Sequence, residues 1–272
     1  MPMPLLTRDG KPYWTPSTPR QRLVRGVITV SILLLTAFAW QVLTVSTHWE
    51  FVADAFQQGN RLLARMFPPD LAYFPTIVQP LIDTINIATL GTLGATLLAV
   101  PVALGAARNT TPHGIVRALC LLVIVTSRSV HSLVWALLLV FVFGPGSFAG
   151  VLAITLRAIG FIAKLLYEAI EEVNHSSIEA IEATGASPAQ RILYGITPQV
   201  LPNFAGIVLF RWDINIREST FLGLVGAGGV GMLLDANVNA LNFPRVAIIL
   251  LAILVMVIAA EWLSAQIRNR IR

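Results

Sequence analysis

The residues best suited to chemistry are spread thinly along this chain. The single cysteine, Cys120, lies inside an apolar run and is expected to be a small buried hydrophobe. No metal-ligand spacing relates the four histidines, which are His48, His113, His131 and His175. We therefore expect no catalytic residue, no metal site and no cofactor bound by this chain.

Charged side chains within apolar runs are better candidates for function. Six of them lie in or near such runs: Arg128, Arg157, Arg211, Asp213, Arg217 and Glu218. A charge at the centre of a bilayer is costly, so these side chains should face protein or water. Asp213 and Arg217 are four residues apart, a helical spacing that favours a structural ion pair.

Arg128 has no obvious partner of opposite charge nearby in the sequence. A guanidinium matches the geometry of a phosphate-like oxyanion, so Arg128 could line a route for such an ion. Snorkelling toward the membrane interface, or pairing with Glu218, explains it equally well. The predicted translocation path consists of Ser127, Arg128, Ser129, His131, Arg217 and Glu218.

The elements that must position these charges are long apolar segments. Of 272 residues, 56% are hydrophobic and only 12% charged, and the mean hydropathy is +0.74. A soluble fold could not hide so much apolar surface, whereas helices can cross lipid because they satisfy their own backbone. The runs are too long for barrel strands. We therefore predict an all-α integral membrane protein with about six transmembrane helices.

The expected spans lie at residues 27–47, 84–107, 115–143, 148–166, 204–222 and 243–263. The third is long, since about 20 residues cross a bilayer. We expect one kinked or tilted helix there, although two half-helices also fit. Within 48–83, an amphipathic helix should lie at the membrane surface and end at Phe67-Pro68-Pro69-Asp70.

Domain organisation follows from these segments. Residues 1–26 are expected to be a disordered tail, and 265–272 a basic tail. Residues 27–83 should hold the first span and the external amphipathic segment, and 84–264 the transmembrane core. The first apolar run starts late and lacks a small-residue cleavage site, so we expect no cleaved signal peptide.

The placement of lysine and arginine predicts the orientation. With the N-terminus inside, the external side holds only Arg61 and Arg65. Six spans then place both termini in the cytoplasm. The net charge of +5 and the pI of about 10 would also suit nucleic-acid binding. The basic residues gather at the ends of apolar runs rather than in one patch, so we expect membrane lipid and no nucleic acid as partner.

The most informative motif lies in the polar loop 167–203. A helix through Glu179 should stop at Gly185, which can take the left-handed conformation. Ser187-Pro188-Ala189-Gln190 has the sequence of a capping box with proline at the first helical position. Pro198 and Pro202 are expected to close the segment. Two helices joined at a sharp corner would form a compact acidic knob on the cytoplasmic side.

This motif resembles the cytoplasmic loop of permease subunits in ATP-binding-cassette importers. Glu179, Ala180, Gly185 and Pro198 fall at matching places, whereas Ile181, Gly195 and Thr197 depart from the pattern. In that family the knob is a coupling helix held in a groove of the ATPase. The resemblance implies docking by Glu179, Ala180, Gly185, Ala186, Ser187, Pro188 and Pro198. It also implies two copies of a separate ATPase that use ATP and Mg, since this chain has no P-loop.

A narrower resemblance covers residues 84–264. The runs 144–153, 164–171 and 222–231 look like the phosphonate and phosphate branch of these permeases, and the last also resembles methionine permeases. The branch implies transport of phosphonate, phosphite or phosphate from an extracytoplasmic binding protein across the bacterial inner membrane, most simply through a homodimer. Methionine or another amino acid is an alternative substrate. A membrane-embedded enzyme would need a polar catalytic cluster that the sequence lacks.

The glycine-rich stretch after the fifth span needs unusual backbone freedom. Its glycines are Gly226, Gly228, Gly229 and Gly231. The family resemblance favours an outer gate at the subunit junction. A tight turn or close helix packing is the alternative.

Overall fold

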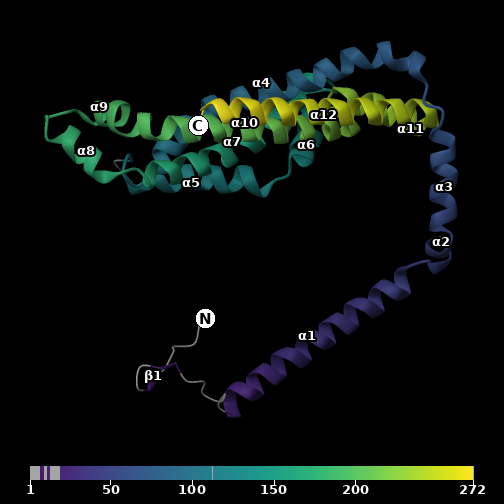
Figure 1. Cartoon of the computed structure of the whole chain (residues 1–272), viewed down its shortest axis with the longest axis horizontal. Helices are drawn as coiled ribbons and strands as arrows, with labels where there is room; N and C mark the ends of the chain where they lie inside the picture. Colours follow the sequence, from purple (N-terminus) through teal and green to yellow (C-terminus); the bar gives the residue numbers. More distant parts are fainter. Residues whose placement is uncertain (1–6, 9–10, 13–18, 112, 272) are drawn as a thin grey trace. The chain divides into compact units, whose positions relative to one another are not determined.

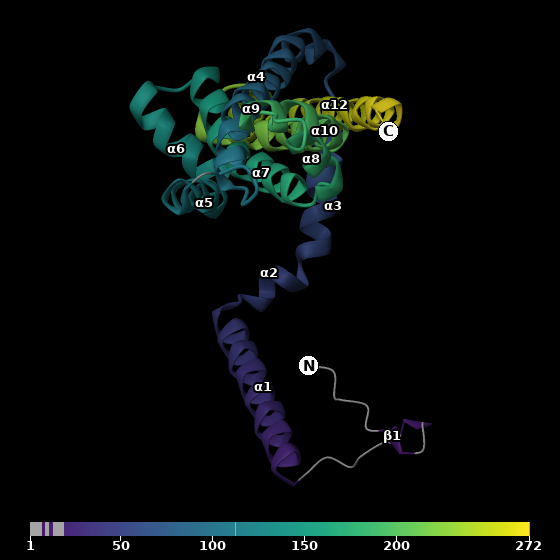
Figure 2. The ribbon, with the colours of Figure 1, turned by 90° about the vertical axis from the view of Figure 1, so that its left-hand side faces the viewer.

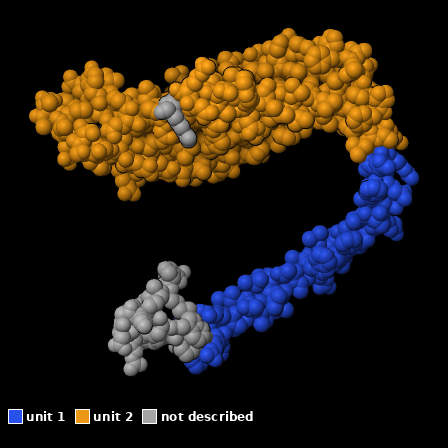
Figure 3. Space-filling model, viewed as in Figure 1, with its two compact units in different colours: residues 1–61 blue, residues 62–272 orange. Residues whose placement is uncertain are grey.

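The computed structural model describes residues 7–8, 11–12, 19–111 and 113–271. The chain divides into two units, residues 1–61 and 62–272 (Figure 3). Two short antiparallel strands, β1 (Thr7–Arg8) and β2 (Lys11–Pro12), are the only strands among the described residues. Helices dominate everything else, so the expected all-α class is confirmed.

Unit 1 contains one long apolar helix. This helix, α1 (Pro19–Ser46), has no buried residue and is long and apolar enough to cross a membrane. It begins eight residues before the expected Val27, because proline suits a first helical turn and the following residues are good helix formers. Residues 19–26 are therefore helical rather than part of a disordered tail. The expected disorder of 1–6, 9–10 and 13–18 concerns residues outside the described ranges.

The segment after α1 forms short helices. These are α2 (Trp49–Ala53), α3 (Ala55–Met66) and the 3-10 turn η1 (Leu71–Tyr73). The expected amphipathic helix is present as α3, and it ends at the predicted Phe67-Pro68-Pro69-Asp70 break. Its place at the membrane surface stays a prediction, as does the domain division at residue 83.

Unit 2 is a bundle of helices (Figure 1, Figure 2). Its longer elements are α4 (Phe74–Ala106), α5 (Gly114–Ser129), α6 (Ser132–Phe143), α7 (Ser147–Glu171), α10 (Thr197–Leu222) and α12 (Phe243–Ile271). Its shorter ones are α8 (His175–Glu182), α9 (Pro188–Gln190), the π-helix η2 (Arg191–Ile196), η3 (Gly223–Val225) and α11 (Val230–Asn239).

The number of spans agrees with the expected six. Five helical segments in the described part of the chain are long and apolar enough to cross a membrane: Pro19–Ser46, Leu71–Ala106, Ser147–Glu171, Pro188–Val225 and Phe243–Arg270. The bent pair α5 and α6 makes the sixth. α4 starts ten residues before the expected Thr84, and the ten-residue helix α11 was not expected at all.

The third span differs from its expected form. One kinked or tilted helix was expected, with two half-helices as the alternative. The structure has the alternative form, because α5 and α6 are two helices bent by 92° around Val130 and His131. Both residues have extended backbone conformations, and His131 caps the start of α6. An extended pair cannot continue the helical hydrogen-bond ladder, so this span is two half-helices.

The expected proline stop after the knob is wrong. Pro198 lies in the first turn of α10 and Pro202 lies inside that helix, which continues to Leu222. A proline in the first turn loses no helical hydrogen bond, because the N–H there has no partner within the helix. The π-helix η2 therefore runs on into the fifth span without a break.

The core of unit 2 forms where α4 packs against α7. Alanines line both sides of this contact, including Ala95 and Ala99 of α4 and Ala158 and Ala163 of α7, and all four are fully buried. Small side chains let two helix backbones approach closely, which is the usual way that helices associate in lipid. The charged α10 then packs onto this pair.

Candidate functional site

A polar seam sets the rotation of α10 against α4. Trp212 Nε1 donates to Thr89 Oγ1 at 3.0 Å, and Asn215 Nδ2 donates to Thr92 Oγ1 at 2.8 Å. One turn further on, Ser219 Oγ donates to the carbonyl of Thr84 at 3.2 Å. These bonds between buried or half-buried groups hold α10 in one orientation, and so they decide where its charged side chains lie.

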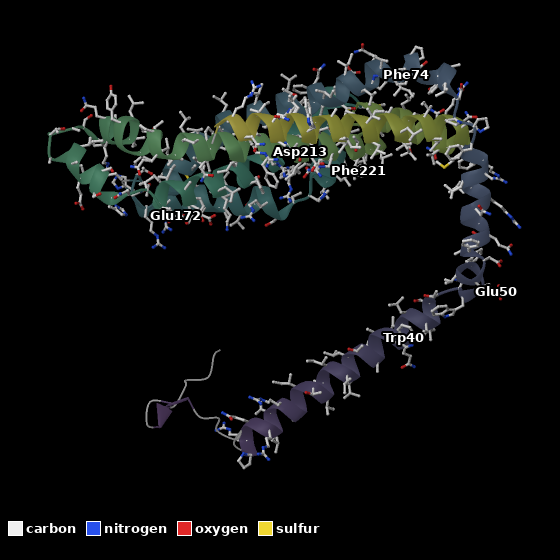
Figure 4. All side chains as sticks on the ribbon, viewed as in Figure 1. Trp40, Glu50, Phe74, Glu172, Asp213 and Phe221 are labelled. Atoms are coloured by element: carbon white, nitrogen blue, oxygen red, sulfur yellow. The ribbon has the colours of Figure 1, made fainter. Side chains whose placement is uncertain are left out.

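Two ion pairs lie along α10. Arg211 is 3% exposed and pairs with Glu218, with 3.3 Å between Nη2 and Oε2. Its guanidinium also lies over the ring of Phe161, 5.3 Å from the centroid. Asp213, labelled within the bundle in Figure 4, pairs with Arg217. The predicted i, i+4 pair is therefore present, and the two pairs together carry no net charge.

The break between α5 and α6 is tied to α7. Ser127 is buried, and its Oγ accepts from Gly160 N at 2.9 Å and donates to the carbonyl of Leu156. Arg157 Nη1 donates to the carbonyl of Arg128 at 2.6 Å. These contacts anchor the last turn of α5 immediately before the chain changes direction.

The predicted path residues divide into two groups. Arg128 and Ser129 have exposed side chains at the end of α5, and Ser129 Oγ bonds to the carbonyl of Val125 at 2.8 Å within that helix. By contrast, His131, Arg217 and Glu218 line a cavity of about 210 Å³ between α6 and α10. Ser127, Arg128 and Ser129 are absent from its lining.

Sequence reasoning missed one polar residue of this cavity. Ser132, the first residue of α6, is 1% exposed and lines the cavity. Its hydroxyl has no hydrogen-bond partner among the described residues. The available signal was a serine directly after His131 at the start of an apolar run. That signal has meaning only if a helix begins there, and the sequence favoured one kinked or tilted helix over two half-helices.

The predicted gate glycines form a packed turn. Gly226, Gly228 and Gly229 have φ values of 83°, 88° and 75°, in the left-handed region that favours glycine. Gly146 N donates to the carbonyl of Gly226 at 2.9 Å, which ties the turn to the start of α7. Gly231 lies in the first turn of α11, against η3. The turn is thus held on several sides, and a gating role for it stays a prediction.

Replacing Gly231 with alanine should destabilise the bundle. A Cβ there would lie 2.9 Å from the Cα of Gly223 and would also clash with the carbonyl of Thr220. The matched control is Gly206→Ala in α10, where a Cβ meets nothing within 4 Å. We expect a lower thermal midpoint for Gly231→Ala, and a gain of up to about 1 kcal/mol for Gly206→Ala from helix propensity. Equal midpoints in detergent would contradict this packing.

The knob within the loop 167–203 has the predicted local geometry. Gly185 ends the first helix with φ 79°, and Ser187 with Gln190 forms the capping box that begins α9. Arg191 bridges the corner, pairing with Glu182 at 2.7 Å and donating to the carbonyl of Asn109 at 3.1 Å. The knob lies at the end of unit 2 opposite α11 (Figure 1).

The predicted docking residues are accessible. Glu179, Ala180, Gly185, Ser187, Pro188 and Pro198 are exposed, and Ala186 is half-buried. Ile178 is buried and anchors α8 against the neighbouring helices. The polar and small residues of the knob therefore point outward, while the buried Ile178 holds α8 in place. Within the described residues, no group of three or more His, Cys, Asp or Glu side chains is placed to hold a metal.

Comparison with known proteins identifies the family. Residues 99–272 match the inner membrane component of binding-protein-dependent transport systems. The chain belongs to this family. It is the membrane-spanning permease subunit of an ATP-binding-cassette importer. Docking of an ATPase on the knob stays a prediction.

Several relatives are similar over most of this permease. HtxC of Stutzerimonas stutzeri, named as a candidate phosphite transport system permease, is 38% identical over 88% of this chain and 84% of its own. The phosphite transport system permease PtxC of the same organism is 33% identical over 94% and 96%. The phosphate-import permease PhnE of Mycolicibacterium smegmatis is 38% identical over 83% of this chain, but that match spans only 44% of PhnE.

Solved structures agree with the fold. The permease in an inward-facing structure of the MetNI methionine transporter superposes with a TM-score of 0.63 at 21% identity. The superposition covers 75% of this chain and 99% of that one. The architecture is therefore that of a type I importer permease.

Proposed function

We propose that this permease forms the inner-membrane path for phosphite, phosphonate or phosphate. The observation that carries the proposal is the 33% identity to a phosphite permease along nearly the whole of both chains. The cavity between α6 and α10 supports it, since Arg217, Ser132 and His131 bring hydrogen-bond donors suited to an oxyanion. Arg128, Ser127 and Ser129 would belong to the same path nearer the cytoplasm, and the glycine turn at Gly226–Gly231 would border its outer mouth.

The importer would work through partners. Two ATPase subunits would bind ATP and Mg and dock on the knob, and an extracytoplasmic binding protein would deliver the substrate. A second copy of this chain would complete the path, because about five spans seldom enclose a route for a hydrated anion. Both termini would lie in the cytoplasm. Within unit 2, α12 runs from the end near α11 toward the knob (Figure 1). A topology reporter fused after Arg272 should read cytoplasmic, and one inserted near Asp70 should read external.

Transport assays test the proposal directly. The permease, co-expressed with its ATPase and reconstituted in liposomes with its binding protein, should take up labelled phosphite, phosphate or a phosphonate when ATP is present. Methionine is the control substrate, because structural relatives carry amino acids. Uptake of methionine in place of all three phosphorus oxyanions would overturn the assignment.

A further inference from the structure

The cavity between α6 and α10 combines groups of opposite hydrogen-bonding character. Its polar lining comes from His131 and Ser132 at the start of α6, and from Arg217 and Glu218 in the C-terminal half of α10. Ile214 and Phe221 supply apolar walls; Figure 4 labels Phe221 on α10. A space of about 210 Å³ is large enough for a small oxyanion.

Ser132 is the residue that points to a ligand. A buried hydroxyl without a partner is unfavourable, and proteins rarely keep one without a reason. Ser132 is 1% exposed, its buried hydroxyl has no partner among the described residues, and the residue is part of the lining of this cavity. It is also the first residue of a twelve-residue helix, whose N-terminal end carries partial positive charge. An anion in the cavity would accept the missing hydrogen bond.

His131 is arranged as a second donor. Its Nδ1 accepts a hydrogen bond from Leu133 N at 3.3 Å, so that nitrogen carries no proton. In the neutral imidazole the proton then belongs to Nε2, which donates.

Arg217 and Glu218 add a cation and an acceptor. Arg217 donates to Asp213 through Nη2, and the other N–H groups of its guanidinium can donate to a ligand. Its side chain is 44% exposed. Glu218 is bonded to Arg211, and an ionised carboxylate only accepts hydrogen bonds. The charged groups around Glu218 are Arg211 and Arg217 on α10, with Arg157 of α7 close to Arg211; Asp213 offsets Arg217.

We propose that this cavity is a subsite for an oxyanion that still carries a hydroxyl group. The bare oxygens would accept from Ser132, His131 and Arg217, while the hydroxyl donates to the carboxylate of Glu218. A fully deprotonated ion has no proton to offer and would face Glu218 as a like charge. The inference rests on the proposed function, and it names the protonation state of the ion that passes.

The Ser132 hydroxyl provides the first test. In proteoliposomes with the complete transporter, Ser132→Ala should lower the maximal rate of phosphite uptake about tenfold, as expected for losing one hydrogen bond to a charged group. The half-saturating concentration should stay unchanged, since the binding protein sets it. If the role of Ser132 is purely structural, uptake by Ser132→Ala should be unchanged. Deleting an unpaired buried hydroxyl leaves the stability of the protein equal or higher. Thr126→Ala, on an exposed face of α5 outside the cavity, is the matched control.

Glu218→Gln provides a second test that does not depend on Ser132. Phosphite loses the proton of its hydroxyl group near neutral pH, much as a phosphoryl group does with a second pKa of about 6. Glutamine can donate as well as accept, so the variant should accept the dianion. The ratio of variant to wild-type uptake should therefore rise about tenfold between about pH 6 and about pH 8. Both proteins use the same binding protein, whose own pH dependence cancels in the ratio.

The outcomes separate the two proposals. Absence of any phosphorus-oxyanion uptake by the wild type overturns the proposed function itself. Normal wild-type uptake with an unaffected Ser132→Ala variant, or a flat pH ratio for an assembled Glu218→Gln variant, overturns the subsite alone. If Ser132→Ala fails to assemble, the pH ratio decides by itself.

Discussion

Replacing Gly185 with valine should uncouple the transporter while leaving its membrane bundle intact. Gly185 has φ 79°, and a β-branched residue strongly resists that conformation. Open space surrounds the position, since an added Cβ meets nothing within 4 Å, so the effect comes from the backbone alone. The left-handed conformation costs an ordinary residue about 1–2 kcal/mol. This cost is large enough for the turn between α8 and α9 to adopt other backbone conformations.

The consequence should appear at the ATPase. A changed corner separates Glu182 from Arg191 and moves the exposed docking residues out of register. We expect ATPase activity stimulated by the binding protein to fall about tenfold, matching the strain of the corner. Membrane insertion and the thermal midpoint of the bundle should be unchanged, because no residue of the spans is altered.

A matched substitution isolates the backbone effect. Asparagine tolerates the left-handed region better than valine does, so Gly185→Asn should keep most of the coupling. Two results would contradict a role of the corner in coupling. One is wild-type coupling in Gly185→Val, and the other is an equal loss of stimulated ATPase activity in both variants.

Removing Arg211 should have the largest effect on stability. Its side chain is buried, pairs with Glu218 at 3.3 Å and lies over the ring of Phe161. Arg211→Met leaves the Glu218 carboxylate without its ion-pair partner, and breaking a buried pair from one side costs about 3–5 kcal/mol. Thermal unfolding in detergent should show a strongly lowered midpoint.

A double-mutant cycle identifies the cause. Arg211→Met combined with Glu218→Gln removes both charges, so it should recover more than half of the loss. Lys164→Met is the comparison, because Lys164 and its partner Glu168 are 36% and 40% exposed, so water solvates the carboxylate that remains and the loss should matter less. If the double variant is no more stable than Arg211→Met, an unpaired carboxylate is not the source of the instability.

Features set by neighbouring residues could be predicted from the sequence. Apolar runs of span length required helices because lipid offers the backbone no other partner, and six such spans are present. The capping box at Ser187 and the left-handed Gly185 depend on residues within a few positions. The pairing of Asp213 with Arg217 follows from one helical turn. In each case the deciding contact lies within the same short segment.

Features set by distant contacts could not be predicted in this way. The 92° break before Ser132 depends on contacts between the end of α5 and α7. Ser127 bonds to the backbone of α7, and the residue at position 160 must be glycine because a side chain there would clash with the end of α5. The cavity exists only because α6 starts at that break beside the C-terminal half of α10. Its hydroxyl, imidazole, guanidinium and carboxylate come from two segments far apart in the chain. Sequence spacing carries no information on their approach, since packing between helices decides it.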